Sequence, residues 1–138
     1  DYTDMTLAVY DLSKIASVAT TATKMATALT EMSSAKWNTL CNSVEWFCSD
    51  DHDYYPHADL YDLAVNALLL DSANASVYKA VKTAVDAAVL YEDHGIAHSK
   101  SHGLAIYFPC DVTMDSNYNS TQIEWAADTQ WDEMLRSR

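Results

Sequence analysis

The sequence predicts a helix-rich α/β domain, and three observations lead to this prediction. Two short apolar runs, residues 6–10 and 103–108, have the lengths and bounding residues of β-strands. Around and between these runs, apolar residues recur every three or four positions, as they do on the buried face of a helix. Glycine and proline are scarce, with two residues of each, which favours long regular elements over a loop-rich scaffold.

The length and composition fit a single folded domain covering residues 1–138. A chain of this length can bury roughly 68–70% of its unfolded surface, and its hydrophobic content of 49% excludes an intrinsically disordered chain. Acidic residues outnumber basic ones 20 to 8, a net charge of −12. Such a surface repels phosphate backbones and anionic membranes, so no nucleic-acid partner is expected. Since no apolar run approaches roughly 18 residues, no membrane span is expected either.

Residues 101–109 form the expected centre of the fold. Five consecutive apolar residues follow Gly103 and end at Pro109. A β-branched and aromatic run with breakers at both ends predicts a strand over residues 103–108 that is buried on both faces. Proline has no N–H to donate to a neighbouring strand, so Pro109 closes it.

The remaining elements are expected in the following order. Residues 6–10 form the first strand, and Asp11 or Ser13 caps the first helix, whose apolar positions are Ile15, Val18, Ala22, Met25, Leu29 and Met32. A second helix spans Trp37 to Phe47, a third runs from about His57 to Leu70, and a fourth runs from Val77 to about Asp93. Gly95 ends the fourth helix in a left-handed conformation. Ser120 or Thr121 caps a short helix around Trp125, and a last helical turn that holds Trp131 begins after Asp128.

The three cysteines give a candidate disulfide. Their number is odd and their spacing fits no zinc template, so no metal centre is expected. Cys41 and Cys48 lie seven positions apart and could be bridged if the second helix ends or bends near Trp46 and Phe47. Two sequons, at Asn74 and Asn119, would permit N-glycosylation in a secretory pathway. Together with the acidity and the aromatic residues, these features favour a secreted, extracellular protein.

A cysteine and a histidine suggest a peptidase dyad, but the spacing argues against it. His102 precedes the predicted central strand, whereas Cys110 follows it. Five or six extended residues, at about 3.3 Å each, would separate the two by roughly 20 Å. A nucleophilic cysteine needs its base within hydrogen-bond reach, so the sequence predicts no catalytic residue.

Two groups of residues suggest binding of a cation or of a sugar, but each has a simpler interpretation. Residues 50–53, with His57 and Asp59, could bind a divalent cation, but they lack the glycine and the closing glutamate of a calcium loop. The histidines at 94, 98 and 102 are spaced only loosely like a metal site. The four tryptophans, Trp37, Trp46, Trp125 and Trp131, could stack on sugars, but helix-packing positions favour a core role for three of them. No metal and no cofactor is therefore expected.

Four separated stretches resemble one family, the clostripain-like cysteine peptidases. Residues 7–14 are similar to a strand and turn of that family, and residues 58–64 are similar to its "DL-x-DF" helix start. Residues 101–109, SHGLAIYFP, resemble its "HGLSIYFP" strand, the most specific of the four, and residues 125–135 resemble its closing "FA-x-x-T-x-W-DEFL". The chain departs from the pattern at Ala105, where serine is usual, and at Cys41 and Cys48.

This resemblance implies a fold and an activity. The family has a caspase-like α/β/α sandwich and cleaves after basic residues with a His/Cys dyad that lies upstream of the region matched here. No residue of this chain matches that dyad, so none is assigned a catalytic role.

Three hypotheses follow from these observations. The first is the non-catalytic C-terminal portion of a secreted clostripain-like endopeptidase, which supports a catalytic half absent from the chain; the missing initiator methionine fits an excised fragment. The second is a free-standing extracellular module that binds copies of itself through exposed strand edges. The third is a metal- or sugar-binding adhesion domain.

Overall fold

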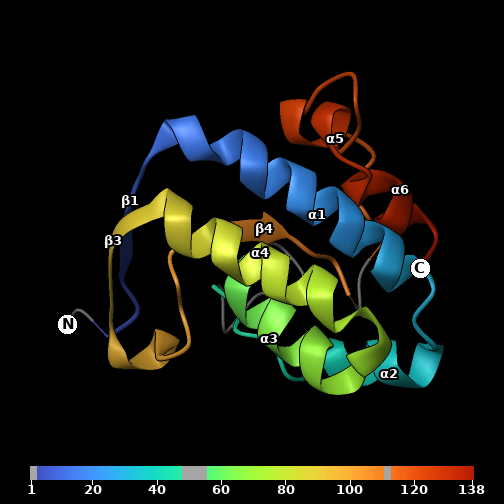
Figure 1. Ribbon diagram of the computed structural model, residues 1–138, viewed down its shortest axis with the longest axis horizontal. Helices are drawn as coiled ribbons and strands as arrows, with labels where there is room; N and C mark the ends of the chain where they lie inside the picture. Colours follow the sequence, from blue (N-terminus) through green and yellow to red (C-terminus); the bar gives the residue numbers. More distant parts are fainter. Residues whose placement is uncertain (1–2, 48–55, 111–112) are drawn as a thin grey trace.

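The computed structural model describes residues 3–47, 56–110 and 113–138 (Figure 1). The helices of this described part are α1 (Ile15–Thr30), α2 (Ser34–Cys41), α3 (Leu60–Leu70), α4 (Ala75–Ala88), α5 (Glu124–Asp128) and α6 (Trp131–Arg136). Its strands are β1 (Thr6–Tyr10), β2 (His57–Asp59), β3 (Val89–His94) and β4 (Ala105–Tyr107). Short 3₁₀ turns cover Leu12–Lys14, Ser72–Asn74 and Ile96–His98. The expected helix-rich α/β class is confirmed.

The described strands pair as two antiparallel ribbons. β1 pairs with β3, from Thr6 opposite His94 to Val9 opposite Tyr91, with a shift in register between Val9 and Tyr10. β2 pairs with β4, with His57 opposite Tyr107, and a single bridge joins Ala58 to Trp46. The expected strand at residues 6–10 has the predicted bounds, and the strand at 103–108 is present but shorter.

The expected burial of the central strand on both faces was wrong. Ala105 is exposed and Tyr107 half-buried, whereas Ile106 is buried. The reason is that alternate side chains lie on opposite faces of the strand: Ile106 and Phe108 face the core, and the face with Ala105 and Tyr107 is covered only in part.

Two strands replace ends of expected helices. His57–Asp59 pairs with β4, so the third helix begins at Leu60, where the Asp59 side chain caps it. The fourth helix ends at Ala88, and its expected last turn is the start of β3. Gly95 has φ −74° and begins a 3₁₀ turn, so the left-handed helix end predicted there was wrong. Likewise, α5 begins after Ile123, not after Ser120 or Thr121.

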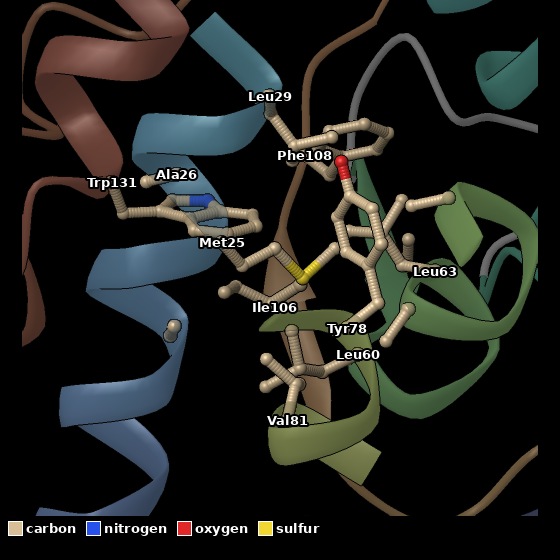
Figure 2. Packing of buried hydrophobic residues seen from close by; sticks show 14 of the residues in the cluster. Met25, Ala26, Leu29, Leu60, Leu63, Tyr78, Val81, Ile106, Phe108 and Trp131 are labelled. Carbon is tan, nitrogen blue, oxygen red and sulfur yellow. The ribbon is translucent and has the colours of Figure 1, made fainter. Parts of the chain in front are cut away.

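The helices pack around β4 to form one core. α1 and α4 lie side by side, and α3 packs against α4 (Figure 1). Their inner faces meet Ile106 and Phe108 of the central segment and Trp131 of α6, as Figure 2 shows. Trp37 and Trp131 are almost fully buried, which agrees with a core role for these two. No helix among the described residues is long and apolar enough to cross a membrane.

Candidate functional site

One buried carboxylate joins two stretches that are far apart in sequence. Asp59 ends β2, and its Oδ1 accepts the Asp62 N–H at 2.9 Å, which caps α3. Its Oδ2 accepts the backbone N–H of His102 at 2.8 Å. The Leu60 N–H donates to the Leu104 carbonyl at 2.9 Å, so the start of α3 is bonded to the segment that enters β4. Asp59 therefore holds the segment that enters β4 against the start of α3.

Burial sets the protonation chemistry of this junction. Loss of hydration raises the pKa of Asp59 above 3.8, although the N–H groups of Asp62 and His102 act in the opposite direction. Burial also raises the pKa of Asp62, whose Oδ2 accepts the Glu45 N–H at 2.7 Å. Asp59 thus accepts two backbone N–H groups and Asp62 accepts one, which is the arrangement of a structural junction.

Gly103 lies against the first ribbon. It has φ +87°, and an added Cβ would lie 2.8 Å from the Ala8 Cβ and 3.1 Å from the Glu92 Cγ. The Tyr10 hydroxyl donates to the Gly103 carbonyl, and burial, followed by the nearby Asp59, raises the pKa of this tyrosine. Only a glycine gives the backbone both this conformation and this close approach.

The His102 side chain does not face a nucleophile. Its ring is exposed and stacks on Tyr61, with ring centroids 3.8 Å apart and planes at 12°. The Lys82 ammonium lies 5.0 Å from the centre of the Tyr61 ring, in cation–π contact. Cys110 is bonded to Cys41 and carries no thiol. The pair that suggested a peptidase dyad is thus divided between an aromatic stack and a disulfide.

The expected disulfide partner of Cys41 was wrong. Cys41 is bonded to Cys110, with the two Cα atoms 5.7 Å apart, across 69 residues of sequence. α2 ends at Cys41, and its last turn packs beside the segment that leaves β4. Cys48, the expected partner, lies outside the described residues. The spacing of the cysteines held no signal for a pairing set by tertiary packing.

The histidines proposed as a loose metal cluster have separate partners. His98 is buried, with Nδ1 3.1 Å from the Glu45 Oε1, and the His94 ring contacts Glu92. Within residues 3–47, 56–110 and 113–138, no group of three or more His, Cys, Asp or Glu side chains could hold a metal ion. The acidic stretch at residues 50–53 lies outside these ranges.

Both candidate glycosylation residues are half-buried and hydrogen-bonded. The Asn74 side-chain amide donates to Asp71 at 2.8 Å, and that of Asn119 donates to the Ser116 carbonyl at 2.8 Å. Each keeps one further amide hydrogen, and glycosylation of either residue stays a prediction.

Two cavities lie along β4 and were not foreseen. One, of about 370 Å³, lies between β1 and the second ribbon; the other, of about 470 Å³, is largely apolar and extends toward Tyr118 and Trp125. His57 and Ala105 line both. The side-chain pattern of a single strand could not reveal these cavities, because their other walls come from β1, from the start of α1 and from residues in and before α5.

Comparison with protein families gives one match. The model of the clostripain family matches residues 1–137, essentially the whole chain. Neither the comparison with curated proteins nor that with solved structures found a match.

Proposed function

The chain belongs to the clostripain family, and from this premise we propose that it is the non-catalytic C-terminal portion of a secreted cysteine endopeptidase, which supports a catalytic half outside these residues. The observation that carries the proposal is that both cysteines of the described residues are joined in a disulfide. A thiol peptidase needs a free thiolate beside a base, whereas Cys41 and Cys110 are bonded to each other. Secretion is proposed on the same ground, because disulfides persist in oxidising compartments.

The proposed role of the chain is structural: it holds the segment around β4 rigidly in its own hydrophobic core. Asp59, Gly103 and the disulfide each fix the segment around β4 from a different element. The proposed activity of the whole peptidase is cleavage after arginine or lysine, as the resemblance implies. A net charge of −12 would attract such basic substrates.

The experiment compares the chain alone with the chain produced together with the polypeptide encoded directly upstream of Asp1. Both preparations are assayed with peptide amides that carry arginine or lysine before the scissile bond, and with a norleucine peptide as the matched neutral control. We expect no cleavage by the chain alone, and cleavage of the basic peptides only by the combined protein. Cleavage by the chain alone would refute the non-catalytic role, and a preference for norleucine would refute the specificity.

A second candidate, a self-assembling module, is favoured by three exposed apolar side chains on one face of a ribbon, although Asp93 lies opposite Leu7 on that face. Leu7, Val9 and Tyr91 share one face of the β1–β3 ribbon and are 60%, 48% and 54% exposed. Sedimentation of the pure chain over a hundredfold range of concentration separates the two candidates. A monomer at every concentration supports the peptidase portion, and a defined oligomer or filament supports the module.

A further inference from the structure

The two sulfur atoms of the disulfide lie in different surroundings. Cys41 is the last residue of α2 and is 4% exposed. Trp37 and Leu40 of the same helix are buried in the same hydrophobic core. Cys110, in contrast, is half-buried and lies in the segment that follows β4. A thiol in solution therefore has readier access to the sulfur of Cys110 than to that of Cys41.

The backbone also holds the two cysteines differently. Cys41 belongs to a regular helix, and its carbonyl accepts the Trp46 indole N–H at 3.3 Å. Cys110 directly follows Pro109 and belongs to none of the helices and strands of the described residues. If the bond between them opened, the Cys41 sulfur would stay in its place at the end of α2, close to the Cys110 backbone.

Thiol–disulfide exchange has two requirements, and these surroundings meet them unequally. The attacking thiolate needs access to one sulfur, and the other sulfur leaves as a thiolate. Attack at Cys110 meets the first requirement, but it expels the Cys41 sulfur into apolar surroundings, which disfavour a negative charge. The bond should therefore open slowly and from the Cys110 side, and the displaced Cys41 sulfur is well placed to close it again.

We propose that Cys110 is the residue to which a small external thiol becomes attached, and that Cys41 is the resolving cysteine that expels this thiol again. In the opening step, the external thiolate bonds to the Cys110 Sγ and the Cys41–Cys110 bond breaks. The electron pair of that bond stays on the Cys41 Sγ, which takes a proton from water. In the closing step, the Cys41 thiolate attacks the Cys110 Sγ and the external thiol leaves.

The disulfide is then a reversible switch that ties the end of α2 to the segment that leaves β4. Each step exchanges one disulfide for another, so the external thiol is the only co-reactant. The switch depends on the burial of Cys41 and not on a catalytic half, and so it goes beyond the function proposed above.

The first experiment uses the Cys48→Ser chain, in which only the two bonded cysteines can react. The folded protein is incubated with a limiting amount of mercaptoethanol and trapped with N-ethylmaleimide, and peptide mass spectrometry locates both groups. We expect mercaptoethanol on Cys110 and maleimide on Cys41, in at least about tenfold excess over the opposite arrangement. In urea the excess should fall to within about twofold, because both sulfurs are then exposed.

Two further variants test the two roles separately. Cys41→Ser and Cys110→Ser are each made in the Cys48→Ser chain and are treated with the symmetrical disulfide of mercaptoethanol. In Cys41→Ser, Cys110 should be modified and should keep the attached group, because no resolving cysteine remains. In Cys110→Ser, Cys41 should react at least about tenfold more slowly, and urea should bring the two rates to within about twofold.

The results distinguish three cases. Attachment to Cys110, with a free thiol at Cys41, in the folded chain supports the proposal. Attachment to both cysteines in similar amounts overturns the assignment of their roles. Exchange in urea alone identifies a closed structural disulfide and overturns the switch. The experiment on the bonded pair decides among these cases even if a serine variant fails to fold.

Discussion

At the scale of single residues, Asp59 explains why two of the family-like stretches occur together. The stretch at 58–64 supplies the carboxylate and the helix that it caps, and the stretch at 101–109 supplies the His102 amide that it binds. The histidine of that stretch contributes its backbone N–H to the junction, while its ring stacks on Tyr61. The sequence motif therefore marks a junction that is held by backbone hydrogen bonds.

The protonation of Asp59 gives a prediction of pH dependence. Burial raises its pKa in the folded chain above 3.8, so its contribution to stability is full below about 3.8 and is lost as the pH rises through the folded value. Asparagine has the same shape and does not titrate. The free energy of unfolding of the wild-type chain minus that of Asp59→Asn should therefore fall from pH 3.5 to pH 7, by at most about 1.4 kcal/mol per pH unit. Urea unfolding at successive pH values measures it, and a difference that rises with pH would contradict it.

The two glycines of the chain give a matched pair of substitutions. At Gly103, φ +87° and contact with Ala8 leave no room for a methyl group. Gly103→Ala should lower the free energy of unfolding by about 2–4 kcal/mol, as backbone strain and overpacking add. Gly95 has φ −74°, which any residue adopts, so Gly95→Ala should change stability by about 1 kcal/mol or less. Chemical denaturation of both variants measures these changes. Equal losses of unfolding free energy in the two variants would refute the requirement for glycine at position 103.

At the scale of elements, periodicity predicted the helices well and the ends of helices poorly. The apolar positions of α1 recur with a clear helical period, so its start at Ile15 could be foreseen. Residues 57–59 and 89–94 adjoin α3 and α4 and continue their patterns, and only the partner strands show that these residues are extended. Strand pairing between distant segments has no local signature, which is why β2 and β3 were missed.

The candidate site was predictable in its motif and not in its contacts. SHGLAIYFP marks the segment, but the partners Asp59, Tyr10 and Ala8 come from other elements. The same holds for the cysteines. Cys41 and Cys48 are near in sequence, whereas the packing of α2 brings Cys41 to Cys110.

The disulfide gives a prediction at the scale of elements, since it ties α2 to the segment that follows β4. It closes a loop of 69 residues. In the chain-entropy model, removing a disulfide that closes a loop of this size lowers the free energy of unfolding by up to about 4 kcal/mol. We expect Cys41→Ala combined with Cys110→Ala to lower the free energy of unfolding by about 2–4 kcal/mol, and reduction of the wild-type chain to lower it similarly. Reduction should leave the double variant unchanged.

The pairing itself is checked by peptide mass spectrometry of the unreduced protein. A fragment that joins the peptides of Cys41 and Cys110 is the expected result. A fragment that joins Cys41 to Cys48, together with an unchanged stability in the double variant, would contradict the pairing.

At the scale of the whole molecule, the core and the open edge lie on the same segment. Ile106 and Phe108 face inward, whereas the backbone groups of Ala105 and Tyr107 point away from β2. Of these groups, the Tyr107 carbonyl accepts the Trp131 indole N–H, and the others have no partner within the described part of the chain. The backbone groups of successive residues along β4 thus point to opposite edges of the strand. A net charge of −12 would oppose association between copies of the chain.

Phe108 contacts three tryptophans from separate parts of the chain. Its ring lies 5.2 Å from that of Trp37, 6.0 Å from that of Trp46 and 6.3 Å from that of Trp131, between centroids. These tryptophans belong to α2, to the segment bridged to β2 and to α6, and Phe108 itself is fully buried. Truncation would leave a cavity that is walled by rigid rings and cannot collapse easily.

We therefore expect Phe108→Ala to lower the free energy of unfolding by about 3–5 kcal/mol, a large part of the roughly 5–15 kcal/mol that holds a domain together. Leu69→Ala, at a residue that is 77% exposed on α3, is the control and should stay within about 0.5 kcal/mol of the wild type. Thermal and urea unfolding of the two variants should show one cooperative transition each. If Phe108→Ala lost only the tertiary signal of α6 and kept the stability of the rest, the C-terminal helices would form a separate unit, and the description of one continuous core would be wrong.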